Sequence, residues 1–149
     1  MKKHPGRGRA GFTLIEILVV VLIITILAGL VGVNILHKPG EARVSAARMQ
    51  LQQLKTAVQL YRAEQGAVPT QEQGLEALVS RPSREPMPRN YPDGGYLDSV
   101  KVPEDPWGRE YLYLAPGRRN ELFEIISYGG DGEPGGSGEA GDLTSSDLQ

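Results

Sequence analysis

Cysteine is absent from this chain of 149 residues, which excludes disulfides, thiolate metal sites and cysteine nucleophiles. Histidine is scarce as well, since the only two are His4 and His37. Neither belongs to an H-E-x-x-H motif, and no G-x-S-x-G nucleophile motif occurs. The sequence therefore offers no credible catalytic set, and we expect a protein that is not an enzyme.

An excess of basic residues is also missing, because 16 Lys and Arg face 18 Asp and Glu and leave a net charge of −2. Four of the positive charges lie before residue 12, so the rest of the chain is more acidic still. Nucleic-acid binding needs a basic face. We therefore expect no nucleic-acid partner.

A long apolar run is the most prominent feature that is present. From Ile17 to Ile35 nearly every residue is Ile, Leu, Val, Ala or Gly, and about 20 helical residues span the roughly 30 Å of a bilayer's hydrocarbon core. Basic residues lie only on its N-terminal side, which keeps that side in the cytoplasm. The pattern predicts a membrane helix over residues 12–36 and an external domain over 37–149.

Glu16 lies at the start of this run. Inserting a charged side chain into a membrane costs about 2.5–3.5 kcal/mol at the centre of a helix, so an ionisable residue in such a segment usually has a function. A secretory signal peptide would have a shorter apolar region followed by a small-residue cleavage site. Here the small residues 28–32 lie within the run. A plain membrane anchor leaves Glu16 unexplained.

The residues around Glu16 form a recognisable motif, Gly11-Phe12-Thr13-Leu14-Ile15-Glu16. It resembles the cleavage and methylation motif of type IV pilins and their relatives. The resemblance implies that a prepilin peptidase removes the basic leader, residues 1–11, by cutting between Gly11 and Phe12. It also implies that the same enzyme methylates the new N-terminus at Phe12.

Cleavage before Phe12 would create an α-ammonium whose reference pKa is near 7.7–8.0, so that it is largely charged at neutral pH. Glu16 lies one helical turn away and can neutralise that charge in its own subunit or in a neighbour. We expect Glu16 to act in assembly by setting the axial stagger between subunits.

A second helical pattern follows the apolar run. Apolar residues recur at spacings of four and three, as one helix stripe requires: Ala47, Leu51, Leu54, Val58 and Tyr61. Gly66 and Pro69 mark the end. We predict one helix from about Phe12 to about Gln65, interrupted or bent at Pro39-Gly40.

The remainder of the chain predicts short elements. Residues 70–73, Thr-Gln-Glu-Gln, have the spacing of a capping box before a short helix. Residues 81–106 predict a long irregular loop, in which Asp105 is expected to be a solvated charge. Trp107, which follows the loop, is expected to be a core or loop anchor. Residues 110–115 and 122–128 predict two strands joined by a hairpin loop at 116–120.

Four stretches of this body occur in the order typical of one family: Tyr61 to Gly66, Pro69 to Leu75, Asp105-Pro106-Trp107-Gly108, and Ser127 to Gly132. They resemble the major pseudopilins of type II secretion systems. The resemblance implies a pilin-like α+β fold, with the long helix packed on a small antiparallel sheet. Val68 departs from the family's usual aromatic residue, and residues 142–146 lack the aromatic common at the C-terminus.

The glycine-rich acidic tail after Tyr128 allows more than one interpretation. Residues 136–141 fit G-x-G-x-x-G, but the chain ends too soon for a dinucleotide fold. Composition alone favours a disordered polar tail. The family resemblance instead implies one bound calcium, held by the side chains of Asp131 and Asp142 and by the carbonyls of Tyr128 and Thr144, with Glu133, Glu139 and Asp147 as possible substitutes.

Together these resemblances imply a structural subunit of a periplasmic filament that helps export folded proteins across the outer membrane. The expected partners are copies of itself in a helical filament, minor pseudopilins, the prepilin peptidase, the assembly platform of the bacterial inner membrane, and the membrane itself. A type IV pilus subunit for adhesion or motility, and a monomeric membrane-tethered binding domain, are the alternatives.

Overall fold

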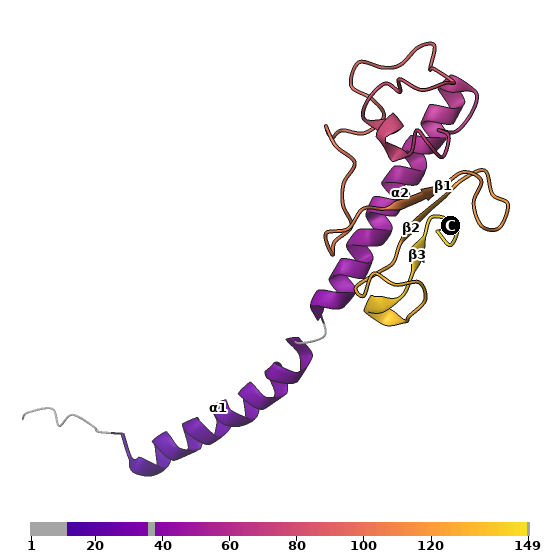
Figure 1. Cartoon of the computed structure of the whole chain (residues 1–149). Coiled ribbons are helices and arrows are strands. Elements are labelled where there is room, and N and C mark those ends of the chain that lie inside the picture. The colour runs from indigo at the N-terminus through magenta and orange to yellow at the C-terminus, as the bar shows by residue number, and fades with distance from the viewer. Residues whose placement is uncertain (1–11, 36–37, 149) are drawn as a thin grey trace, which may run out of the picture. The chain divides into compact units, whose positions relative to one another are not determined.

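The computed structural model describes the backbone of residues 12–35 and 38–148 and the side chains of residues 12–28 and 39–148. By its internal contacts the chain divides into two compact units after Lys38. The elements, in chain order, are α1 (Leu14–Ile35), α2 (Lys38–Gln65), η1 (Leu75–Leu78), β1 (Leu112–Leu114), β2 (Glu124–Ser127), η2 (Gly138–Ala140) and β3 (Leu143–Thr144) (Figure 1). The predicted leader, including Gly11, lies outside the described residues.

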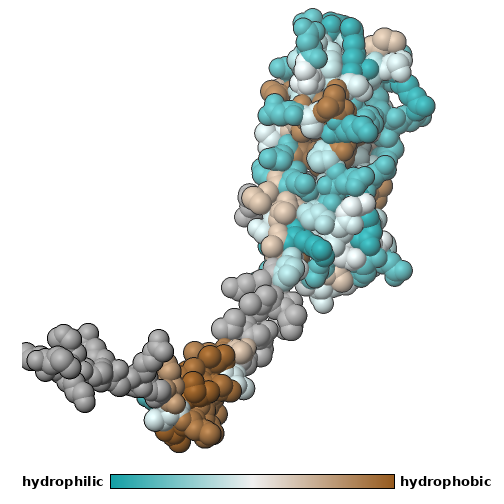
Figure 2. Space-filling view, turned by 90° about the vertical axis from the view of Figure 1, so that its left-hand side faces the viewer, coloured by the Kyte–Doolittle hydropathy of each residue, from teal (hydrophilic) through white to brown (hydrophobic). Residues whose placement is uncertain are grey.

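Helix α1 is apolar on every described side. Its large hydrophobic side chains from Leu14 to Leu27 are between 43% and 82% exposed, and they form the brown surface of that helix in Figure 2. Among the residues that the structure describes, no helix is both long and apolar enough to cross a membrane.

Helix α2 confirms the predicted stripe. All five apolar residues of the stripe are at most 3% exposed, while Arg48 and Arg62 on the same helix are exposed. The helix ends at Gln65, where the Gly66 N–H donates to the Arg62 carbonyl and Gly66 takes a φ of +83°. The predicted interruption at Pro39-Gly40 differs from the structure, because α2 already begins at Lys38. Proline is tolerated in a first helical turn, whose N–H groups have no partner within the helix.

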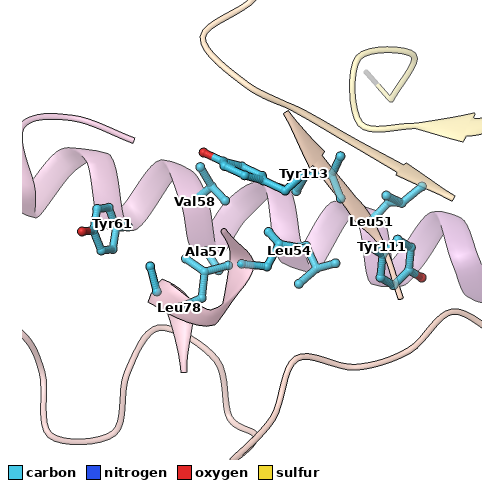
Figure 3. Packing of buried hydrophobic residues seen from close by; sticks show 11 residues of the cluster. Leu51, Leu54, Ala57, Val58, Tyr61, Leu78, Tyr111 and Tyr113 are labelled. Atoms are coloured by element: carbon cyan, nitrogen blue, oxygen red, sulfur yellow. The ribbon is translucent and has the colours of Figure 1, made fainter. Parts of the chain in front are cut away.

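The core of the second unit lies between α2 and the segments that cross it. Leu51, Leu54 and Val58 of α2 pack beside Leu78 of η1 and Tyr113 of β1 (Figure 3). The Tyr113 hydroxyl, buried with its ring, donates to the Pro69 carbonyl at 2.8 Å.

The sheet has the order β1-β2-β3, and both pairs are antiparallel. The predicted hairpin is confirmed, since Leu112 pairs with Ile126 and Leu114 with Glu124 around the loop at 116–120. Asn120 has a φ of +64° in that loop, a conformation that Asn tolerates better than most residues. Strand β3 was not predicted: it is two residues long and follows the glycine-rich segment.

The capping box at 70–73 is present, but the helix behind it is not of the expected type. The Thr70 N–H donates to Gln73 Oε1 at 3.0 Å, and the Gln73 N–H donates to Thr70 Oγ1 at 3.2 Å. These reciprocal bonds close a turn at residues 71–74, and only the four-residue 3-10 helix η1 follows. As predicted, residues 81–106 contain no helix or strand.

An ion pair between a buried carboxylate and a half-exposed arginine holds the hairpin loop on the sheet. Glu124 is 1% exposed and accepts from Arg118 Nη2 at 2.9 Å, from Arg118 Nε at 3.1 Å and from the Arg118 N–H at 3.0 Å. These bonds lower the pKa of Glu124 although burial opposes that shift. The loop is therefore fixed by charge-assisted hydrogen bonds, which are stronger than neutral ones.

The C-terminal tail packs on the body without an aromatic residue. Leu148 is partly buried against the core, and its carbonyl accepts from Lys55 Nζ of α2 at 2.6 Å. An ion pair between Arg119 and Asp147, at 3.1 Å, adds a contact to the hairpin loop. Leu148 therefore attaches the tail to the core and to α2.

Candidate functional site

The first candidate site is the start of α1, where Thr13 and Glu16 form a capping box. The Thr13 N–H and the Thr13 hydroxyl donate to Glu16 Oε2 at 2.7 Å and 2.8 Å. The Glu16 N–H donates back to Thr13 Oγ1 at 3.3 Å. Two of the N–H groups that a helix start leaves unpaired are satisfied in this way.

Sequence reasoning assigned Glu16 to the ammonium of Phe12 and missed its contact with Thr13. The signal was present, since Thr-x-x-Glu before an apolar run is the capping-box signature. Only Oε2 of Glu16 takes part in the box, and Thr13 stays in the chain after a cut before Phe12. Within the part of the chain that the structure describes, no hydrogen bond reaches the second oxygen, Oε1, which leaves it for the ammonium that the assembly hypothesis requires.

The second candidate site is the segment between β2 and β3, residues 128–142, which we call the acidic loop. Glycines with positive φ shape it at five positions: Gly129, Gly132, Gly135, Gly136 and Gly138. At Gly129 a Cβ would lie 2.6 Å from the Gly141 carbonyl oxygen and 2.8 Å from that of Glu139. The two ends of the loop therefore touch backbone to backbone, and a side chain there would separate them.

The predicted carboxylate ligands, Asp131 and Asp142, are both tied to this loop. Asp131 Oδ1 accepts from the Glu133 N–H at 3.1 Å, and Asp142 Oδ1 accepts from the Gly135 N–H at 3.0 Å. The two donors are two residues apart, and a chain spans at most about 7 Å over that distance. Among the described residues, no hydrogen bond reaches Oδ2 of either aspartate.

The two predicted carbonyl ligands differ in their surroundings. The Tyr128 carbonyl accepts from the Gly132 N–H at 3.1 Å, and a carbonyl oxygen has a second lone pair for another partner. Thr144 lies in β3. Its carbonyl accepts from the Asp147 N–H at 3.3 Å, and its hydroxyl donates to Asp147 Oδ2 at 3.3 Å. Because Thr144 is 7% exposed and lies in β3, outside the acidic loop, it has the least support of the four predicted ligands.

Two of the possible substitutes are engaged elsewhere. Glu139 Oε1 accepts from Trp107 Nε1 at 3.1 Å and from Arg43 Nη1 of α2 at 3.3 Å. Asp147 pairs with Arg119. Glu139 therefore ties the acidic loop to the beginning of α2, beside Gly40, where a Cβ would collide with the Glu139 carboxylate.

The acidic loop suits a hard cation in its chemistry. Ca²⁺ takes six to eight oxygens, including backbone carbonyls and waters, and needs few carboxylates. Among the side chains that the structure describes, in residues 12–28 and 39–148, no group of three His, Cys, Asp or Glu comes together. Two aspartates and the carbonyls of one glycine-rich loop match calcium better than zinc, which prefers Cys and His.

A buried hydrogen-bond network that the sequence did not predict is centred on Asp105 and reaches the end of β2, where the acidic loop begins. Asp105, predicted as a solvated charge, is 4% exposed. Its carboxylate accepts from the N–H groups of Trp107 and Arg109 at 3.1 Å and 2.9 Å, and from the Ser127 hydroxyl at 2.6 Å. The Asp105 prediction was wrong because the donors come from its own turn and from a strand 22 residues away.

Two family models together cover most of the chain. The model described as "Type II secretion system (T2SS), protein G" matches residues 34–146. The model described as "Prokaryotic N-terminal methylation motif" matches residues 6–32, around the predicted cut and Glu16.

Curated relatives and a solved structure agree with these matches. The type II secretion system core protein G of Pseudomonas aeruginosa is 44% identical over 137 residues, which are 92% of this chain and 94% of that protein. That of Vibrio cholerae is 40% identical over 149 residues, 100% of this chain and 98% of that protein. The crystal structure of the major pseudopilin from the type 2 secretion system of enterohaemorrhagic Escherichia coli has a TM-score of 0.61 at 36% identity, and the match covers 74% of this chain and 92% of that one.

Proposed function

The chain belongs to the type II secretion system protein G family and is a pseudopilus subunit of type II secretion, and we propose that it polymerises through its N-terminal helix once its leader is removed. The prediction of a pilin-like pseudopilin is confirmed by these similarities. A type IV pilus subunit explains the N-terminal motif but not the match of the body over residues 34–146. The role is structural and needs no catalytic residue.

One observation carries the proposal that α1 is the assembly element. Its described apolar side chains are exposed all round the helix, and a helix that is hydrophobic on all sides is normally buried in a membrane or in a protein core. In the precursor the inner membrane covers this helix, and in the filament the same helices of other copies cover it. The globular unit then lies in the periplasm.

Glu16 gives this assembly its register. Its capping box with Thr13 satisfies one carboxylate oxygen within the subunit, and the ammonium of a methylated Phe12 in a neighbouring subunit meets the other. An unpaired buried carboxylate is costly, so the stagger that pairs it is preferred. Minor pseudopilins, the prepilin peptidase and the inner-membrane assembly platform complete the set of partners, and the filament helps to drive folded proteins outward.

The experiment compares two alanine variants in cells that produce the prepilin peptidase. Glu16→Ala should still be cut at Gly11 yet form no filaments, because its ammonium has no partner. Glu41→Ala, which removes an exposed carboxylate in the first turn of α2, is the control and should assemble. Processing is followed by gel mobility and filaments by electron microscopy; filaments of normal number and length from Glu16→Ala would contradict the proposal.

The second part of the proposal is a calcium ion in the acidic loop. Asp131 and Asp142 would hold it together with the Tyr128 carbonyl, and Thr144 is retained as a weaker candidate. When bound, the ion links residues at the two ends of the loop, as a disulfide would in a chain that had cysteines. The support is the glycine-shaped backbone and the two aspartates tied to amides two residues apart.

A further inference from the structure

Arg109 reaches the acidic loop from 20 residues upstream. Its Nη1 donates to the Gly129 carbonyl at 2.6 Å, and its Nη2 donates to the Gly130 carbonyl at 3.1 Å. One guanidinium therefore holds two consecutive carbonyls immediately before Asp131. Only arginine offers two such donors in a rigid fork.

The backbone of Arg109 is itself fixed. Its N–H donates to the buried carboxylate of Asp105, and the Asp105 N–H donates to the Arg109 carbonyl at 2.8 Å. The same carboxylate accepts from Ser127 at the end of β2, whose Oγ in turn accepts from the Gly129 N–H at 3.3 Å. The backbone of Arg109 and the end of β2 are thus both hydrogen-bonded to the buried carboxylate of Asp105.

The first turn of the acidic loop also wraps closely over the guanidinium. A Cβ added at Gly132 would lie 2.6 Å from Arg109 Nε and 2.7 Å from its Cζ. Gly132 also has a φ of +74°, which favours glycine, and a side chain there would displace the guanidinium. The turn that carries Asp131 therefore rests directly on Arg109.

We propose that Arg109 is a positioning residue for the calcium ion in the acidic loop: its fork holds the carbonyls of Gly129 and Gly130 and thereby fixes the turn that presents Asp131. This inference rests on the proposed calcium site. A loop that is ordered before the ion arrives loses less conformational entropy on binding. Side chains that orient metal ligands typically change the affinity by about 10- to 100-fold when they are replaced.

The positive charge of Arg109 cannot be the reason for this effect, because a cation near a calcium site opposes binding. The fork geometry and the charge are separated by two variants. Arg109→Lys keeps the charge but cannot hold both carbonyls in parallel, and Arg109→Met removes the charge together with the fork.

The test measures calcium affinity by isothermal titration calorimetry on the full chain in detergent, with CaCl2 as the titrant. Both Arg109→Lys and Arg109→Met should raise the Kd for calcium by about tenfold or more. Val58→Ala is the control, because Val58 is fully buried in a core cluster that contains no residue of the acidic loop. It should lower the melting temperature while leaving the Kd within about twofold of the original chain.

The outcomes separate this inference from the proposal on which it rests. If the original chain does not bind calcium, both the calcium site and the positioning role of Arg109 are contradicted. An original chain that binds, with an Arg109→Lys variant of unchanged Kd, overturns the positioning role alone. If Arg109→Met binds calcium more tightly than the original chain, the guanidinium acts only as a nearby positive charge. That result also overturns the positioning role. Circular dichroism of each variant verifies that the body is folded.

Discussion

The core beside α2 and the acidic loop are held by different forces. The core buries Leu51, Leu54 and Val58 of α2 with Ile125 of the sheet, each with no exposed surface. In the acidic loop, η2 has no buried residue, and the described contacts are polar: hydrogen bonds that involve backbone groups, and the contacts of the Glu139 carboxylate with Trp107 and Arg43. Apolar burial stabilises the first region without a ligand, whereas the second depends on polar contacts and on the ion that we propose.

This difference implies that the two regions respond to different changes. Damage to the core should lower stability equally with and without calcium. Damage to the acidic loop should act mainly on the part of stability that calcium adds. Leu54→Ala and Asp131→Asn, the first and the last of the predictions below, test that separation.

The largest effect is expected in the core, from Leu54→Ala. Removing a fully buried leucine side chain costs about 2–5 kcal/mol, because contacts are lost and a cavity remains. Urea unfolding followed by circular dichroism should show this loss in calcium and in chelator alike. Leu122→Ala is the control, since Leu122 is 55% exposed and its loss should have little effect. A loss seen only in chelator would break the separation.

A smaller effect is expected from the ion pair between Arg118 and Glu124. The Glu124 side chain is 2% exposed and that of Arg118 is 46% exposed. Arg118→Met leaves a buried carboxylate without its main partner and should cost about 3 kcal/mol, at the lower end for a broken buried pair. Glu124→Gln leaves a half-exposed guanidinium that water can solvate, and should cost less. Equal costs in urea unfolding at pH 7 would contradict this asymmetry.

The same pair should make stability depend on pH. The hydrogen bonds from Arg118 lower the pKa of Glu124 in the folded state from its ordinary value of 4.5. The folded pKa is thus below the unfolded one, so this stabilisation is complete above about pH 4.5 and is lost as the pH falls through the folded pKa. Glu124→Gln should flatten the stability curve in that acidic range.

The smallest effect is expected from Asp131→Asn in the acidic loop. At a hundredfold excess over its Kd, a bound ion adds about 2.7 kcal/mol to the original chain, and the variant should lose that increment while its stability in chelator changes little. Melting curves with calcium and with chelator measure the increment. Asp93→Asn, at an exposed aspartate of the 81–106 loop, should keep it. If the chelator leaves the melting temperature of the original chain unchanged, the calcium proposal is contradicted.

The sequence predicted the elements that depend on local pattern. The stripe from Ala47 to Tyr61 follows helical periodicity, the capping box at 70–73 has its own spacing, and the hairpin around 116–120 joins two runs of β-formers. Each of these signals lies within one short stretch of chain.

The features that were missed depend on partners distant in the sequence. Strand β3 has two residues and exists because β2 offers it a free edge. Asp105 is buried because Ser127 and the turn behind it supply donors. No sequence motif around Arg109 predicts its contact with Gly132. Thr13 is the exception, because its capping signal was readable beside Glu16.

The central claim is that this chain is cut before Phe12 and enters a filament through its first helix. The most direct test is the intact mass and N-terminal sequence of the protein purified from the membranes of its native cells. The account predicts a chain that begins at Phe12 and is heavier by one methyl group at its N-terminus. A mature chain that begins at Met1, or beyond Gly29, would contradict it.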